Sequence, residues 1–325
     1  MNNKLKIEIP VHKPVLVKEI NRGFGLIAPL NNQAEASKKV IIDATLGGGG
    51  HAAEFLLNGA YVLGIDTDEE MVKIAGENLR KIVDSKLACP TGNYDDFFKI
   101  VDGNFSEIDR IASENNIKNV SAILLDLGIS SYHYLFDNRG FSFQKPQDRL
   151  DMRLSTKQKV TAADLLNALG KDNLMDLFLQ ALSYPDALKL TKEVLEFRKV
   201  RPIEKVSDML EIVSKTAKGR GYKKSGINKS TLPFLALRIA VNSELDNLAI
   251  VLKKAWNLLA SGGKLAVISF HSGEDKLVKS FFRERLGEDG RDEEYIIPGE
   301  DEVANNPRAR SAKLRILTKY EKSDL

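Results

Sequence analysis

The chain has 325 residues, of which 43% are hydrophobic and 29% charged, and it contains 23 glycines and 10 prolines. These proportions are those of an ordinary globular protein, which excludes collagen-like, disordered and disulfide-scaffold classes. At about 150 residues per domain, the length predicts roughly two domains. The single cysteine, Cys89, indicates a reducing compartment. Together with a polar N-terminus and short apolar runs, it predicts a cytoplasmic protein without a membrane segment.

The net charge of +3 is distributed unevenly along the chain. The range 141–234 has 18 lysines and arginines against 11 aspartates and glutamates, an excess of 7 positive charges. Within it, residues 215–229 (KTAKGRGYKKSGINK) carry six basic residues and no acidic one. A basic segment interrupted by glycines can follow a phosphate backbone, although a solvated loop has the same composition.

The first 130 residues alternate between strand and helix patterns. Apolar, β-branched runs predict strands at 40–44 and 61–65, with a short helix at 51–58 between them. Apolar residues spaced by three and four predict a helix up to residue 83, and two further strands are expected at 99–102 and 122–125. This alternation is typical of an α/β fold, a parallel sheet covered by helices on both faces.

The pattern changes at residue 141. The range 141–234 has helical periodicity and no convincing strand, which predicts an inserted, mainly helical domain. A long helix should then run from about 235 to the glycines at 262–263, and a buried strand should follow at 264–270. Two final strands are expected near 295–297 and 313–318, and the acidic stretch 288–302 is expected to be a surface excursion. The sheet domain is therefore predicted to be discontinuous, made of residues 1–140 and 235–325.

The strongest local signal is the sequence DATLGGGGH, in which a strand ends in four glycines and enters a helix. Gly47, Gly49 and Ala52 have the G-x-G-x-x-A spacing of nucleotide-binding turns. Asp66 follows about 20 residues after Gly47, where the acidic residue of such motifs meets ribose hydroxyls. The motif predicts a nucleoside-type ligand, and both NAD and S-adenosylmethionine have the required adenosine. A tight strand-to-helix turn without a ligand is the alternative.

Ligands of open α/β sheets bind outside the carboxyl ends of the strands, so the residues at those positions are candidates for ligand contact. Asp102 could reach an adenine edge, and Phe105 offers a face for adenine, although core packing would suit Phe105 equally well. Asp126 is placed to meet an ammonium group or an incoming amine. A carboxylate directly after the apolar run AILL is costly to bury without a partner, so we favour function over a cap or turn.

Ten segments in order along the chain resemble the bacterial 16S ribosomal RNA cytosine-N4 methyltransferases. The most specific of them are DLGISS with RGFSF, SFHSGED and NPRARS. The complete set is HKPVLVKEI, DATLGGGGHAAEFL, GIDTD, DGNF, ILLDLGISS, DNRGFSF, LDMRL, ALRIAVNSEL, GGKLAVISFHSGED and NPRARSAKLR. They run from His12 to Arg315, so the resemblance covers nearly the whole chain.

The resemblance implies a Rossmann-like, class I S-adenosylmethionine-dependent methyltransferase sheet with an inserted substrate-recognition domain. It implies N4-methylation of a cytosine in the decoding region of 16S ribosomal RNA, with the small ribosomal subunit as partner. At His133 the family usually has Gln. The implied cofactor contacts are Gly49, Gly50, His51, Asp66, Phe105, Asp126 and His133.

Asp126 and His271 are the candidate catalytic residues. Asp126 could accept the amino protons of the target base, but binding of the cofactor alone is equally consistent with the sequence. His271, at a strand end, could position substrate or cofactor. Methyl transfer from a sulfonium needs no metal. His271 and Glu274 are three residues apart, as metal ligands on a helix can be, but no other histidine is spaced to complete such a site, so no metal site is expected.

Several aromatic and basic residues are candidates for contact with RNA. Phe141 and Phe143 could stack on an extruded base or could lie in a hinge between domains. Arg238, Asn242 and Glu244 could line a cleft or form a buried polar network. Two other classes remain open, a nicotinamide-dependent oxidoreductase and a non-catalytic ribosome-assembly factor. The candidate phosphate contacts are Arg139, Arg149, Arg153, Arg308, Arg310 and the 215–229 segment.

Overall fold

The computed structural model describes residues 14–26, 38–87, 89, 92–216 and 228–321. It divides into two compact units. The first, here the sheet unit, consists of Met1–Ser130, Lys254–His271 and Val278–Leu325, and the second, the helical unit, of Ser131–Lys253 and Ser272–Leu277. The insertion expected at 141–234 lies inside the helical unit. Among the described residues, no helix combines the length and apolar character needed to span a membrane.

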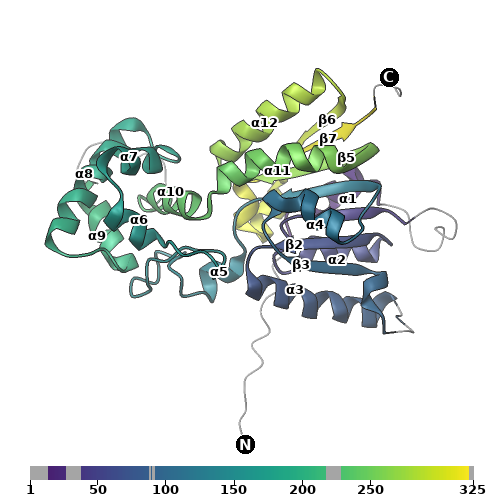
Figure 1. The fold of residues 1–325 in the computed structure, drawn as a ribbon, viewed down its shortest axis with the longest axis horizontal. Helices are drawn as coiled ribbons and strands as arrows, with labels where there is room; N and C mark the ends of the chain where they lie inside the picture. Colours follow the sequence, from purple (N-terminus) through teal and green to yellow (C-terminus); the bar gives the residue numbers. More distant parts are fainter. Residues whose placement is uncertain (1–13, 27–37, 88, 90–91, 217–227, 322–325) are drawn as a thin grey trace, which may run out of the picture. The chain divides into compact units, whose positions relative to one another are not determined.

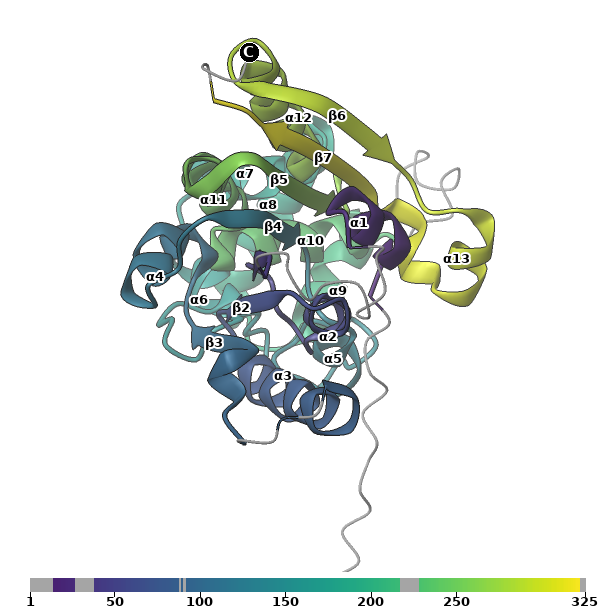
Figure 2. The ribbon, with the colours of Figure 1, turned by 90° about the vertical axis from the view of Figure 1, so that its right-hand side faces the viewer.

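A seven-stranded sheet forms the centre of the sheet unit (Figure 1). The strand order is β3-β2-β1-β4-β5-β7-β6, in which β1 to β5 are parallel and β7 is antiparallel to both of its neighbours. Figure 2 shows β6 and β7 side by side at one edge. The strands are β1 (Val40–Asp43), β2 (Tyr61–Asp66), β3 (Phe98–Asp102), β4 (Val120–Asp126), β5 (Leu259–Ser269), β6 (Gly290–Ile296) and β7 (Lys313–Lys319).

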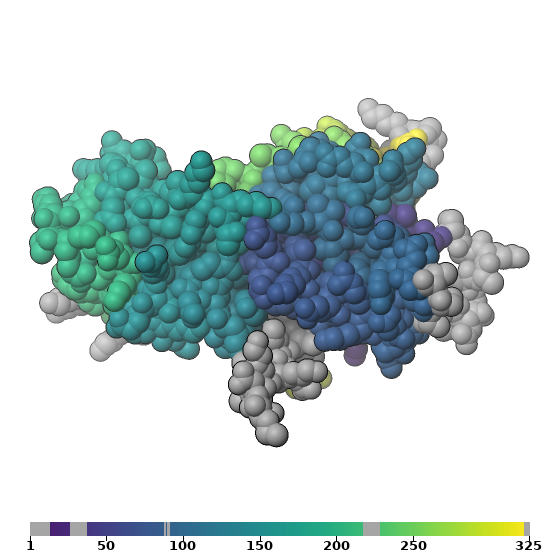
Figure 3. Space-filling model, turned by 60° about the horizontal axis from the view of Figure 1, so that its bottom comes forward, coloured from purple at the N-terminus to yellow at the C-terminus, as the bar shows by residue number. Residues whose placement is uncertain are grey.

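Helices cover both faces of this sheet (Figure 2). One face carries α1 (Val17–Gly23), α2 (Gly50–Leu57) and α3 (Glu69–Ile82), and a short π-helix, Val83–Leu87, extends α3. The other face carries α4 (Ile108–Glu114) and the parts of α11 (Glu244–Leu258) and α12 (Ser272–Leu286) that belong to the sheet unit. The outer side of α3, dark blue in Figure 3, presents exposed charged residues to solvent.

Burial on both faces explains the continuous apolar runs in the parallel strands. Ile41 and Ile42 are adjacent in β1, point to opposite faces, and are both fully buried. The same holds for Leu124 and Leu125 in β4. The alternation of strands and helices expected from the sequence is therefore confirmed, and so is the α/β fold class.

The helix expected from about residue 235 to the glycines is two helices. α10 (Thr231–Asn242) and α11 are separated by Ser243, whose φ of 49° is left-handed. Because a left-handed residue cannot continue a right-handed helix, the axis changes direction there. Apolar periodicity alone does not show such a break, because apolar residues recur at helical spacing in both helices.

Strand β5 begins at Leu259, earlier than the expected start at residue 264. Gly262 has a left-handed φ of 76°, and a Cβ added at Gly263 would lie 3.0 Å from the Val120 carbonyl oxygen. The two glycines thus lie inside an irregular strand rather than ending a helix, because they allow the backbone to pass close to β4.

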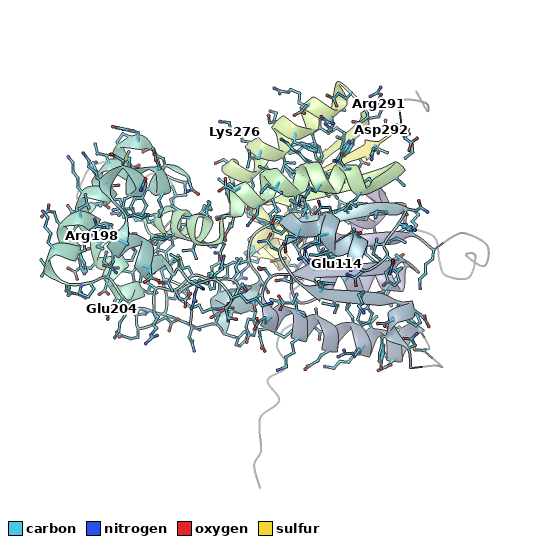
Figure 4. The ribbon with its side chains drawn as sticks, viewed as in Figure 1. Glu114, Arg198, Glu204, Lys276, Arg291 and Asp292 are labelled. Carbon is cyan, nitrogen blue, oxygen red and sulfur yellow. The ribbon has the colours of Figure 1, made fainter. Side chains whose placement is uncertain are left out.

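The expectation of a surface excursion at 288–302 is wrong for its first half, because residues 290–296 form the edge strand β6. Arg315 of β7 pairs with Glu293 at 2.9 Å and stacks over the Tyr295 ring. The charges of this segment, including Arg291 and Asp292 labelled in Figure 4, thus belong to an edge strand, where they discourage pairing with another chain. The rest of the stretch includes α13 (Glu300–Asn305).

The helical unit contains α5 (Ser131–Leu135), α6 (Ala162–Ala168), α7 (Lys171–Leu179), α8 (Tyr184–Val200), α9 (Val206–Thr216), α10 and most of α11. Within its described part, a single isolated bridge between Arg149 and Lys205 is the only strand-like pairing. Asn242 donates to the Met152 carbonyl oxygen and accepts from the Leu154 N–H, each at 2.8 Å. These two hydrogen bonds hold the irregular segment around residues 152–154 against α10.

Candidate active site

Each of the strands β1 to β4 ends in an aspartate, namely Asp43, Asp66, Asp102 and Asp126. The register places Asp43 opposite Gly64 and Leu124, and Asp66 opposite Asp102. Because the strands are parallel, the four carboxylates lie along one edge of the sheet, where open α/β sheets bind ligands.

Asp66 holds the glycine loop between β1 and α2. Its Oδ2 accepts a hydrogen bond from the Gly47 N–H at 2.7 Å, and its Oδ1 accepts one from the Asp68 N–H at 2.9 Å. A carboxylate accepts about four hydrogen bonds, so these contacts are compatible with ribose hydroxyls as further donors. Asp66 therefore orders the loop as well as facing the expected ligand position.

The glycine loop needs glycine for two reasons. Gly49 has a φ of 81°, and a Cβ there would lie 3.3 Å from Leu79. Gly48 differs, because a Cβ added there meets no atom of the described residues within 4 Å. The space above Gly48 is thus open to a ligand. Gly50 begins α2, and Gly49 precedes it without a side-chain cap, so the positive end of this helix faces the same loop.

The buried His51 and the half-buried Asp126 form a pair in the sheet unit. His51 Nε2 lies 3.5 Å from Asp126 Oδ2, and the imidazole stacks against Phe55. The Asp126 N–H donates to Thr45 Oγ1 at 2.6 Å, which ties the end of β4 to the loop after β1.

Three buried polar atoms of this pair have no hydrogen-bond partner among the described residues. They are His51 Nδ1, His51 Nε2 and Asp126 Oδ1. Leaving such an atom unpaired costs about 1–3 kcal/mol. Unsatisfied atoms of this kind at a ligand-binding edge fit a site whose partner is a bound molecule.

Asp43 is a further candidate, which the sequence analysis did not single out. Its side chain is 1% exposed, and burial raises its pKa to about 7. The positive character of His51 opposes this rise, whereas the charges of Asp126 and Asp66 add to it. The signal in the sequence was its position as the last residue of a buried strand, directly before the glycine loop.

Phe105 opens a short 3-10 turn after β3, and the Asn104 side chain accepts from the Ser106 N–H at 2.9 Å. The Phe105 side chain is half-buried and does not belong to the buried core. This position favours a ring face offered to a ligand over core packing. Asp102, which pairs in register with Asp66, is exposed.

The two remaining predicted site residues are histidines in different units. His271 is half-buried and follows the end of β5 in the sheet unit. His133 belongs to α5 of the helical unit, is 3% exposed, and contacts the Phe141 ring edge-on at 5.2 Å. The sheet unit thus brings together Gly49, Gly50, His51, Asp66 and Asp126, and the contact of His133 with a cofactor stays a prediction.

Two arginines expected to touch RNA have structural partners within the helical unit. Arg139 donates to Asp137 and to the carbonyl oxygens of Arg153 and Leu154. The Arg153 guanidinium donates two hydrogen bonds to Asp151. These contacts favour a structural role for both arginines within the helical unit.

Phe141 is 5% exposed, and Phe143 packs edge-on against Phe234, so the hinge or core interpretation is favoured over base stacking. Arg238 forms a bidentate pair with Glu244, at 2.8 and 2.9 Å. With the Asn242 contacts described above, this pair favours the polar-network alternative. Residues 217–227 of the basic segment lie outside the described residues. Arg149, Arg308 and Arg310 are exposed and stay candidates.

The fold and this site together define the class of S-adenosylmethionine-dependent methyltransferases with a Rossmann-like sheet. The chain belongs to the MraW methylase family, whose sequence profile matches residues 10–290. The resemblance noted in the sequence is therefore confirmed, and S-adenosylmethionine is the cofactor.

Two relatives share the name ribosomal RNA small subunit methyltransferase H. One, from Methylacidiphilum infernorum, is 40% identical, with 98% of each chain covered. Another, from Dictyoglomus thermophilum, is 37% identical, with 96% of this chain and 98% of the relative covered. A solved rRNA methylase from Streptococcus thermophilus is 10% identical with a TM-score of 0.41, covering 93% of this chain and 96% of that one.

Proposed function

We propose that this protein transfers the methyl group of S-adenosylmethionine to the N4 amino group of a cytosine in the decoding region of 16S ribosomal RNA. The relatives' name supports small-subunit ribosomal RNA as the target. The observation that carries the chemistry is the buried Asp126 Oδ1 at the ligand-binding edge, which has no hydrogen-bond partner among the residues that the structure describes.

The residues of the sheet unit suit this cofactor. The backbone at Gly49 and Gly50 would approach it closely, Asp66 would accept from the ribose, and Phe105 would offer a face to adenine. His51 and Asp126 would supply the polar atoms that are unsatisfied in this structure. Once bound, S-adenosylmethionine supplies an activated methyl group with a good leaving group, so the task left to the protein is orientation.

The target nitrogen is a poor nucleophile, because its lone pair is delocalised into the cytosine ring. A hydrogen-bond acceptor for an amino proton would help to localise that pair. We assign this role to Asp126 Oδ1, and the amino proton lost when the N–C bond forms would pass to it. Thr45 fixes the Asp126 backbone, and His51, 3.5 Å from the other oxygen, would keep the carboxylate oriented.

His271 is proposed as a positioning residue for the base or the cofactor. It follows the end of β5, and β5 pairs with β4, the strand that ends at Asp126. The cytosine itself must be unpaired or extruded, since a base edge within a stem cannot reach a buried methyl group. His133 is proposed as a further cofactor contact from α5.

The test is to incubate the protein with methyl-labelled S-adenosylmethionine and small ribosomal subunits lacking the modification, and then to map the label. We expect one labelled cytosine, with the methyl group on N4. Label on another base or on protein would contradict the proposal. Oxidation of NADH without methyl transfer would favour the oxidoreductase alternative. Binding of RNA without transfer of the labelled methyl group would favour the assembly-factor alternative.

A further inference from the structure

The helical unit has an open groove of about 450 Å³ that the proposed chemistry does not use. All of its lining residues belong to this unit, on or next to α6, α7, α10 and α11. Its apolar residues are Leu165, Leu169, Leu177, Ile239, Ala240 and Leu245.

The rim of the groove is polar and acidic. Asp176 and Asp246 are both exposed, and they are the charged residues among those that line it. Asn173, Gln180 and Ser243 complete the rim and are exposed as well. An apolar floor with a polar rim is the usual composition of a protein interface.

Local contacts build the groove into the fold. Arg198 of α8, labelled in Figure 4, donates to the carbonyl oxygens of Leu166 and Leu169, each at 2.8 Å, and so holds the chain that leaves α6. On the opposite side, the left-handed Ser243 turns the chain from α10 into α11. The walls are therefore fixed by hydrogen bonds and backbone geometry before any partner binds.

We propose that this groove docks a basic, amphipathic protein segment of the small ribosomal subunit. The inference rests on the proposed function, which makes that particle the substrate. Two carboxylates repel RNA phosphates, so the groove is unsuited to RNA. Proteins bound to ribosomal RNA carry lysines and arginines that neutralise phosphates, and such side chains complement Asp176 and Asp246.

The shape also favours a peptide. Small-molecule pockets enclose most of their ligand, whereas every polar residue of this rim is exposed. An aliphatic side chain of an extended segment would fill the floor between Leu177 and Ile239, with flanking basic residues at the rim. The groove would thus favour the assembled particle over naked RNA as substrate.

The first experiment compares methylation of assembled subunits and of naked 16S RNA by a double variant, Asp176→Lys with Asp246→Lys. We expect KM for assembled subunits to rise about tenfold, with KM for naked RNA unchanged or lower. The control, Glu196→Lys with Glu204→Lys, makes the same charge change at exposed positions outside the groove and should alter neither KM more than about twofold. Thermal unfolding checks that both variants fold.

An unchanged KM for assembled subunits would overturn the inference, and an equal loss with both substrates would indicate an RNA contact instead. The second experiment replaces Gln180 with a benzophenone amino acid and irradiates the enzyme with purified subunits. A crosslink to a lysine- or arginine-rich segment of a subunit protein supports the proposal. A crosslink to RNA or to a second enzyme molecule, or none, contradicts it. Wild-type enzyme that methylates neither substrate would refute the proposed function itself.

Discussion

Asp126 has the most informative side chain in the candidate site, because two roles are compatible with its position. A cofactor ligand and an acceptor for the amino proton would both lie at the end of β4. We expect Asp126→Asn to keep its affinity for S-adenosylmethionine and to lose about 10²–10⁴-fold in methylation rate, since the amide cannot take the proton. Calorimetry and single-turnover methylation separate the two effects. Loss of cofactor affinity with an unchanged chemical step would refute the catalytic assignment.

Asp43 shows how burial turns a strand-end carboxylate into a group that titrates near neutrality. Its folded-state pKa of about 7 lies above the ordinary value of 3.8, so the folded protein binds the proton more tightly than the unfolded chain. Stability from this group is therefore present at low pH and is lost as the pH rises from about 4 to 7.

Asp43→Asn should remove that dependence, because an amide does not titrate. The free energy of unfolding of the variant, relative to wild type, should increase between pH 4.5 and 7.5 by at most about 4 kcal/mol. Urea denaturation at several pH values measures the difference. A difference that stays constant with pH would show that Asp43 does not titrate in this range.

At the scale of elements, the loop from β1 to α2 offers a matched pair of substitutions. Gly49→Ala should lower stability by about 1–3 kcal/mol, because Gly49 has a left-handed φ and its added Cβ would press on Leu79. Gly48→Ala should leave the melting temperature nearly unchanged, since open space surrounds the added methyl.

The two glycine variants are distinguished by cofactor affinity measured on folded protein. Gly48→Ala should weaken S-adenosylmethionine binding, because the methyl would occupy space that we assign to the ligand. Unchanged affinity in this variant would mean that the cofactor does not approach the loop at this position.

Element boundaries also show what local patterns miss. The sequence predicted α2, α3 and all seven strands, because apolar periodicity is a local property of the chain, but it did not predict the short helices α1 and α4. It missed the break at Ser243, which depends on the left-handed backbone of one residue between two apolar helices. It also missed the full length of β6, because charged residues on an edge strand resemble a loop.

At the scale of the whole molecule, the charge distribution predicts different salt dependences for the two substrates. RNA affinity should fall steeply as salt rises, because binding releases counterions from the phosphates, whereas cofactor affinity should change little. Arg308→Ala with Arg310→Ala should reduce the slope of log K against log salt by about 1.5 for single-stranded RNA if both arginines contact phosphates. Filter binding over a range of salt measures this slope. If the variant lowers log K equally at every salt concentration and leaves the slope unchanged, the two arginines do not contact phosphates.

The sequence by itself determined the order of the strands along the chain, the glycine loop and three of the four acids at the strand ends, because each is encoded in a short, local pattern. Only the tertiary structure decided how those ends meet, which gives Asp43 its raised pKa and leaves Asp126 Oδ1 without a hydrogen-bond partner in the described part of the chain. It also assigned Arg139 and Arg153 to internal contacts, and it formed the acidic groove from helices distant in sequence. Burial and charge coupling depend on residues that come together only when the chain folds, so no local pattern contains them.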